Sequence, residues 1–429
     1  MLEKLKNKIN IDNLPIYLLI IVVINLLPLA IPNALTKKSC GASTIFIISA
    51  FAVQCILMFL IFYKELKVSK KGKLNLLLLS IISLIQFTIR ILEVVVFKEN
   101  MFMDILDIAC KFATIFSFYI LMLDVKIKEE KIFILVKGIV YIILVACLFN
   151  MIFYSNELFN SFFKGEFRKN FQVFKSFFAN RNQFSFFIYI GIAMDMLLIL
   201  KNKDIKYKIF LGIFIFNVVI ALSRTAMLIV FLFMFMFLVS TDKIKLSDKI
   251  EIAMLIMIAI LTVFLIFAKL APNIFGKMLN ELKMTVIRPS SLKNLSGRTK
   301  LWKLAFSLIG TNLLTIFIGY GRFKGIKAIK ANGDRFTQFH NSFIEAMVSG
   351  GIIELLYFLF IYENVANTVI KSNLEKKYKR LYISFEISSM IYMFSESIGR
   401  FSIGIVDLIC IITFVTLPIL HSNGIKNNE

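Results

Sequence analysis

The sequence predicts an all-α, polytopic membrane protein with about twelve transmembrane helices. Hydrophobic residues make up 59% of the chain and the mean hydropathy is +0.81, whereas a soluble domain is roughly 45–50% apolar. Apolar stretches of about 20 residues recur along the chain, and this length crosses a hydrocarbon core about 30 Å thick. Because lipid offers no hydrogen bonds to a bare backbone, each stretch is expected to be helical.

The expected spans form one integral membrane domain over residues 1–429. They centre near residues 14–33, 43–63, 75–97, 104–123, 132–153, 183–200, 209–222, 225–240, 252–270, 342–363, 383–396 and 402–420. The first span follows a basic segment, and no convincing small-residue cleavage site follows it, so we expect it to remain as a helix. No internal repeat divides the spans into two related halves, which argues against a two-halved transporter.

Lysine is concentrated in alternate loops between the expected spans. These loops are 64–73, 126–131, 201–208, 243–249 and 371–380, and the short loops between them hold Lys37, Lys38, Lys98 and Arg400. Because cytoplasmic loops carry an excess of Lys and Arg, this pattern predicts that both termini are cytoplasmic. The net charge of +23 then reflects topology and affinity for anionic headgroups. Nucleic-acid binding is not expected, because the lysines alternate with spans and form no single face.

The longest break in hydrophobicity, residues 271–341, is predicted to be an external loop subdomain between the ninth and tenth spans. Within it, residues 298–310 have the apolar spacing of a helix, and Gly319, Gly321 and Gly325 mark a turn-rich segment. The arginines and the histidine of this segment are Arg288, Arg298, Arg322, Arg335 and His340. Positive charge beside a membrane favours a substrate that is anionic and membrane-bound.

Arg224 and His340 are candidate chemical groups at the membrane edge. Arg224 lies between two short apolar spans, where an arginine is costly to bury unless it is paired. Its planar guanidinium can bind phosphate oxygens in a bidentate manner; snorkelling to lipid headgroups is the alternative. His340 stands where the chain re-enters the membrane, and imidazole is well suited to accept a hydroxyl proton near neutral pH. A structural role for this histidine is the alternative.

Other charged residues in or near the expected spans are interpreted as structural pairs, with a proton or ion relay as the alternative. They are Arg90 with Glu93, Asp104 with Asp107 and Lys111, Asp195, and Glu396 with Arg400. The five cysteines are scattered without a CxxC pair, so neither a metal site nor a disulfide framework is expected. The expected outer loops hold no DxD or clustered carboxylate motif, which favours a mechanism without a metal.

Four segments resemble motifs of the O-antigen ligase and polymerase family, and they occur in the family's order. They are FANRNQFSFFIYI around Asn180 to Asn182, SRTAMLIVFLF from Ser223, GRTKLWKLAFSLIG followed by GYG at Gly319 to Gly321, and HNSFIEAMVSGGI from His340. The resemblance covers about residues 178–360. The segment GYGRFKG departs from the family's usual GxGxG pattern.

The resemblance implies a membrane glycosyltransferase. We expect it to use no cofactor, and the missing carboxylate motifs favour a mechanism without a metal. Such an enzyme takes a glycan from undecaprenyl pyrophosphate and passes it to an acceptor hydroxyl outside the membrane. By motif position, the family's two essential arginines correspond to Arg224 and Arg298, and its essential histidine to His340. Arg288, Arg322, Arg181, Asn182 and Asn341 are expected to bind substrate.

A polymerase of surface polysaccharide (O-antigen, capsule or exopolysaccharide) is the expected activity, with another lipid-linked repeat unit as acceptor. A ligase that uses the lipid A core as acceptor, and a polysaccharide flippase or transporter, are the alternatives. The expected location is the bacterial cytoplasmic membrane, with the active site facing the periplasm or exterior. The expected partners are the undecaprenyl-pyrophosphate-linked oligosaccharide, membrane lipids, a chain-length regulator and a flippase.

Overall fold

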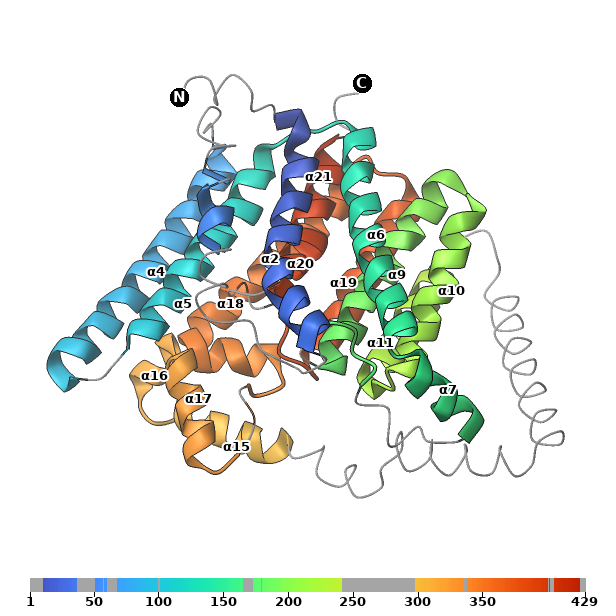
Figure 1. Ribbon diagram of the computed structural model, residues 1–429. Coiled ribbons are helices and arrows are strands. Elements are labelled where there is room, and N and C mark those ends of the chain that lie inside the picture. Colours follow the sequence, from blue (N-terminus) through green and yellow to red (C-terminus); the bar gives the residue numbers. More distant parts are fainter. Residues whose placement is uncertain are drawn as a thin grey trace, which may run out of the picture.

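The computed structural model describes residues 11–36, 51–56, 58–59, 68–98, 101–164, 173–178, 180–240, 298–334, 336, 338–399, 401 and 405–424. Every regular element within these ranges is a helix (Figure 1). The predicted ninth span, residues 252–270, lies outside the described residues, as does most of the second span. Arg288, Arg335 and Arg400 also lie outside them.

The helices follow one another with short connections through most of the described chain. They are η1 (Ile11–Asn13), α2 (Leu14–Thr36), α4 (Lys70–Phe97), α5 (Phe102–Ile115), η2 (Phe116–Ile120), η3 (Leu121–Asp124), α6 (Glu129–Phe153), α7 (Ser155–Lys164), α9 (Arg181–Asn202), α10 (Ile205–Ile220), α11 (Arg224–Val239), α15 (Arg298–Ile309), α16 (Leu313–Ile318), α17 (Arg322–Ala331), α18 (Ser342–Lys371), α19 (Lys376–Met393), α20 (Ile405–Cys410), η6 (Ile411–Thr416) and α21 (Leu417–Gly424).

Six helical segments among the described residues are long and apolar enough to cross a membrane. They are Lys70–Val96, Phe102–Asp124, Glu129–Phe153, Arg181–Asn202, Ser342–Lys371 and Ile405–Gly424. Ile11–Leu27 and Arg224–Val239 are shorter apolar helices. The prediction of a polytopic helical membrane protein is therefore confirmed, whereas the number twelve stays a prediction.

The bundle and the α15–α17 segment are arranged around α18. Helix α18 packs on α19 within the bundle and on α15, α16 and α17 beside it (Figure 1). Helices α15–α17 lie together at one end of the bundle, where α9 and α11 begin and α19 ends. The helix ends that border the lysine-rich loops, such as the end of α9 and the start of α19, lie at the opposite end. This arrangement agrees with the alternation of basic loops, and the cytoplasmic location of the lysine-rich end stays a prediction.

A break inside α18 receives the loop between α16 and α17. Gly350 and Gly351 have non-helical backbone angles, and Gly351 has a φ of 72°, a conformation that glycine adopts without steric cost. Beside this break, the carbonyl of Val348 accepts hydrogen bonds from the N–H groups of Tyr320 (2.8 Å) and Gly321 (2.9 Å). The glycine-rich segment and the broken helix are thus joined main chain to main chain.

Candidate functional site

The carboxylate of Glu396, just after α19, brings together three side chains from distant parts of the chain. Its Oε1 accepts hydrogen bonds from Arg298 Nη2 (2.8 Å) and Asn182 Nδ2 (3.1 Å). Its Oε2 lies 3.1 Å from His340 Nδ1. Arg298 begins α15, Asn182 lies in the first turn of α9, and His340 precedes α18. We call these four residues the Glu396 cluster.

The backbone around His340 is held in an uncommon conformation. His340 has a φ of 54°, which places it in the left-handed region. Asn341 caps α18, because its side chain accepts hydrogen bonds from the N–H groups of Phe343 and Ile344, both at 3.0 Å. Trp302 Nε1 donates to the carbonyl of Phe339 at 3.0 Å and ties α15 to the residue before His340. The cap and this contact therefore fix the position of the imidazole.

Buried hydrogen bonds hold the Glu396 segment against the start of α18. Glu345 Oε1 accepts the N–H of Phe339 (2.6 Å) and the hydroxyl of Ser397 (3.0 Å). Ser342 Oγ donates to the carbonyls of Glu396 and Ile398. Ser342, Glu345 and Ser397 are all buried. The distance between His340 and Glu396 is thus set by interior contacts and not only by the pair itself.

Two further arginines that we predicted lie beside Asn182. Ser223 Oγ donates to Asn182 Oδ1 at 3.2 Å, and Arg224 follows Ser223 as the first residue of α11. Arg181 Nη1 donates to the carbonyl of Leu222 at 3.0 Å. The structure therefore brings Arg181, Asn182 and Arg224 to the same end of the bundle as Arg298.

Two predicted substrate-binding residues, Arg322 and Asn341, are placed differently, and a third lies outside the described residues. Arg322 lies apart from the Glu396 cluster, with Nη1 2.7 Å from Asp107 Oδ1. Asn341 lies next to His340, but its side chain is engaged as the helix cap and also donates to the carbonyl of Phe394 at 3.0 Å. Arg288 lies outside the described residues.

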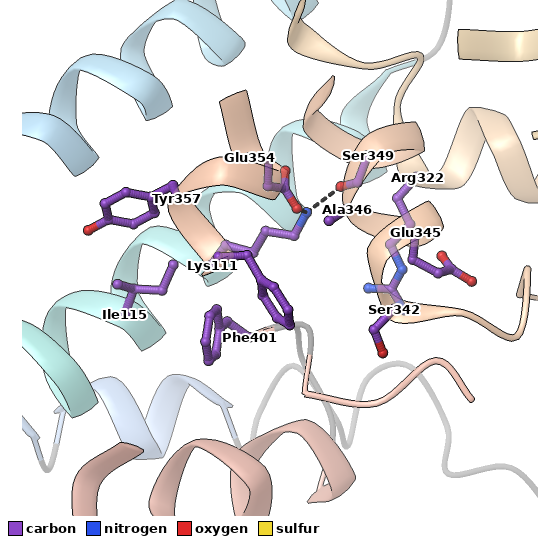
Figure 2. Close-up of a pocket in the computed structure, with 11 residues that line it drawn as sticks. Lys111, Ile115, Arg322, Ser342, Glu345, Ala346, Ser349, Glu354, Tyr357 and Phe401 are labelled. Atoms are coloured by element: carbon purple, nitrogen blue, oxygen red, sulfur yellow. Dashed lines mark hydrogen bonds and ion pairs between the residues drawn. The ribbon is translucent and has the colours of Figure 1, made fainter. Parts of the chain in front are cut away.

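The Arg322 pair belongs to a second group of charges, between α5, α17 and α18. Lys111 Nζ lies 3.0 Å from Asp107 Oδ2 and 2.8 Å from Glu354 Oε1, and it also donates to Ser349 Oγ. Burial opposes the charge of Arg322, but the Asp107 carboxylate favours it, and the net effect raises the pKa of Arg322. A small cavity of about 30 Å³ adjoins the group, with Lys111 and Glu354 on one side and Arg322 and Glu345 on the other (Figure 2). We call Asp107, Lys111, Arg322 and Glu354 the Asp107 network.

Sequence reasoning missed the role of Glu396. We interpreted it as a structural partner of Arg400, whereas its carboxylate contacts Arg298 and His340. One signal was available, because Glu396 is the last residue of the eleventh expected span, at the end predicted to face the same side as the long loop. Within the described residues, no group of three or more His, Cys, Asp or Glu residues could hold a metal ion.

Residues 209–359 match the family model described as O-antigen ligase. The chain resembles the O-antigen ligase and polymerase family. The predicted resemblance is thereby confirmed, and the matched segment contains Arg224, Arg298 and His340. Asp107, Asn182 and Glu396 lie outside it. No curated protein matches the chain.

Proposed function

We propose that this chain is a membrane glycosyltransferase that polymerises surface polysaccharide outside the cytoplasmic membrane. The donor is a glycan on undecaprenyl pyrophosphate, and the acceptor is a hydroxyl of another lipid-linked repeat unit. The observation that carries the proposal is the shared carboxylate of Glu396, which holds Arg298 and His340 beside each other. This transfer needs a cation that binds the pyrophosphate and a base that accepts the proton of the hydroxyl, and an arginine and an imidazole supply them.

The contact between Glu396 and His340 favours imidazole as the base. An ionised carboxylate only accepts hydrogen bonds, so the 3.1 Å contact with Glu396 favours a proton on Nδ1 and leaves Nε2 as an acceptor. The amide nitrogen of Gln338, 3.3 Å from Nδ1, then donates no hydrogen bond to it. The acceptor hydroxyl oxygen then attacks the anomeric carbon of the donor sugar, and its proton passes to Nε2 of His340. Glu396 stabilises the imidazolium that results, as a carboxylate does beside the histidine of a hydrolase triad.

The arginines serve the leaving group in this proposal. As the bond between the anomeric carbon and the phosphate oxygen breaks, its electron pair stays on the undecaprenyl pyrophosphate. Arg298 and Arg224 stabilise the growing negative charge as preorganised cations. The Arg298 side chain is 20% exposed, so a pyrophosphate can reach it while Glu396 holds it. Arg181, Asn182 and Asn341, together with Arg288, remain our proposed substrate contacts around this centre.

A ligase that uses the lipid A core is a second candidate, favoured by the family description itself. The two activities share the donor and the proposed chemistry but differ in the acceptor. Purified protein in liposomes, supplied with a defined undecaprenyl-pyrophosphate oligosaccharide, separates them. Long polymer from the oligosaccharide alone supports the polymerase, and transfer only after lipid A core is added supports the ligase.

A flippase is tested by the same preparation and by a deletion strain. Release of free undecaprenyl pyrophosphate together with a new glycosidic bond supports a transferase. Single repeat units accumulate on the outer side of the membrane when a polymerase is deleted, and on the cytoplasmic side when a flippase is deleted. Cytoplasmic accumulation without any transfer by the purified protein would overturn the proposed function. A chain-length regulator and a flippase are the partners that a polymerase would require.

A further inference from the structure

Helices α4 and α5, which lie outside the segment matched by the family model, contact the loop that begins α17. Arg90 Nη2 of α4 donates to the carbonyl of Gly319 at 2.9 Å. Asp104 Oδ1 of α5 accepts the N–H of Phe323 at 2.8 Å, and Asp107 Oδ1 pairs with Arg322 at 2.7 Å. Three polar contacts from two membrane helices therefore converge on residues 319–323.

These contacts are buried and are therefore sensitive to loss of a partner. Arg90, Asp104 and Asp107 are each 2–4% exposed. Asp107 engages both of its oxygens, Oδ1 with Arg322 and Oδ2 with Lys111. Removing the charge of Asp107 leaves the Arg322 guanidinium in a largely buried place without this carboxylate, which is costly.

A small hydrophobic core connects this anchored loop to Arg298. Leu301 and Ala305 of α15 pack with Ile329 of α17 and Val348 of α18 in one buried cluster. Arg298 lies one turn before Leu301 on α15. The packing is close, so a shift of α17 is transmitted to α15 and to the Arg298 guanidinium.

We propose that Asp107 is a positioning residue, which holds α15–α17 through Arg322 so that Arg298 lies on Glu396. This proposal rests on the proposed function for its kinetic consequence. Asp107 contacts no group that we assign to substrate, and it acts on the reaction only through the placement of Arg298. In this proposal the guanidinium of Arg322 binds Asp107 and does not bind the substrate phosphate.

The kinetic test uses Asp107→Asn, Arg322→Gln and the double variant in the full chain, reconstituted with the lipid-linked oligosaccharide. Misplacement of Arg298 by about 1 Å is expected to lower kcat by about 10- to 100-fold in Asp107→Asn, with little change in KM. The double variant replaces the ion pair by two neutral amides, so it is expected to recover most of the lost kcat. Asp107→Glu keeps the charge and is expected to retain more activity than Asp107→Asn.

The second readout needs no activity. Lys327 and Lys330 are exposed on α17, and trypsin cleavage after them in detergent-solubilised protein reports whether α17 is held in place. Cleavage should be faster in Asp107→Asn and return towards the wild-type rate in the double variant. Glu375→Gln is the control, because it removes a carboxylate paired with Lys377 (2.9 Å) beside the start of α19, at the other end of the bundle. It should leave both kcat and cleavage of α17 unchanged.

Two results would overturn the positioning role. One is an Asp107→Asn protein with wild-type kcat and wild-type cleavage of α17. The other is a double variant that is less active than Asp107→Asn alone, which would mean that Arg322 acts on substrate directly. A wild-type protein without transferase activity would count against the proposed function alone, because the cleavage rates still decide whether Asp107 holds α17.

Discussion

The Glu396 cluster and the Asp107 network both pair carboxylates with an arginine, but they differ in how many donors each carboxylate serves. A single carboxylate, Glu396, serves an arginine, a histidine and an amide. In the Asp107 network, Lys111 and Arg322 are held by two carboxylates, those of Asp107 and Glu354. A carboxylate that serves three donors can release one of them to a pyrophosphate. A buried ion pair with equal numbers of cations and carboxylates resists replacement of either partner.

The location of each group in the fold fits this difference. The Glu396 cluster lies where helices begin or end, and the Arg298 and His340 side chains keep 20% and 15% of their exposure. Asp107 and Lys111 lie within a membrane-spanning segment, where their side chains are 3% and 9% exposed, although their partners Arg322 and Glu354 are 15% and 17% exposed. Because Glu396 itself is only 7% exposed, the two groups differ in their position more than in their exposure. Charges at helix ends favour chemistry at the membrane surface, and charges within a span, such as Asp107 and Lys111, favour anchoring. The following predictions test this contrast.

The largest effect is expected from His340→Ala. Loss of a general base costs about 10²- to 10⁴-fold in rate, so polymer formation should fall below detection while the protein still inserts into the membrane. His421→Gln is the control, because His421 is the other histidine and is buried beside α6 and α19. Polymer ladders of normal length from the His340→Ala protein would exclude this residue as the base.

Arg298→Ala is expected to have the next largest effect. Removing one preorganised donor from a developing charge costs about 10²- to 10³-fold in kcat. Arg298→Lys should retain part of the activity, because it keeps the charge but loses the planar pair of donors. Single-turnover release of undecaprenyl pyrophosphate measures this step, and an unchanged rate in Arg298→Ala would contradict the assignment.

Glu396→Gln is expected to lower kcat by about 10- to 100-fold, less than loss of the base itself. Glu396 also holds Arg298, so only the part of its effect that passes through His340 should vanish in the His340→Ala background, and the double variant should lose less than the sum of the two single losses. Additive losses in this cycle would show that Glu396 acts independently of the imidazole.

Thermal stability should depend on the Asp107 network more than on an exposed ion pair. Asp107→Asn breaks a buried pair, which costs about 3–5 kcal/mol, and should lower the midpoint of thermal unfolding in detergent. Glu375→Gln removes an exposed pair with Lys377 that is worth at most about 1 kcal/mol, so it should change the midpoint little. Equal unfolding midpoints for the two variants would show that the buried pair of Asp107 stabilises the protein no more than an exposed pair does.

The smallest effect is expected from chelation. The proposed transfer uses guanidinium groups at the leaving group, so excess EDTA should leave the rate of polymer formation unchanged. Loss of activity with EDTA, restored by Mg²⁺ or Mn²⁺, would contradict the metal-free mechanism.

Local patterns in the sequence were enough to predict the helical membrane class. The lengths of the apolar stretches follow directly from the thickness of the bilayer, and six such helices appear among the described residues. The motif order identified Arg224, Arg298 and His340 within the segment that matches the family model. The separation of helix α15 from the spans was also expected from the spacing within residues 298–310.

Partners across the chain could not be predicted in the same way. Glu396 is 98 residues from Arg298 and 56 residues from His340. Gln86 and Glu354, which are also in contact, are 268 residues apart. Hydropathy and basic loops indicate which helix ends share a side of the membrane, but they carry no information on which of those ends are in contact. For the same reason, the sequence did not predict the ion pair between Arg322 and Asp107.

The sequence by itself determined that this chain is a bundle of membrane helices with a family motif set and a long polar insertion. Its apolar lengths and basic loops act through the bilayer, which imposes the same rules on every span. The tertiary structure alone decided which charges meet, because a carboxylate finds its cations by packing and not by position in the chain. That packing places Glu396 between Arg298 and His340, and Asp107 beneath Arg322.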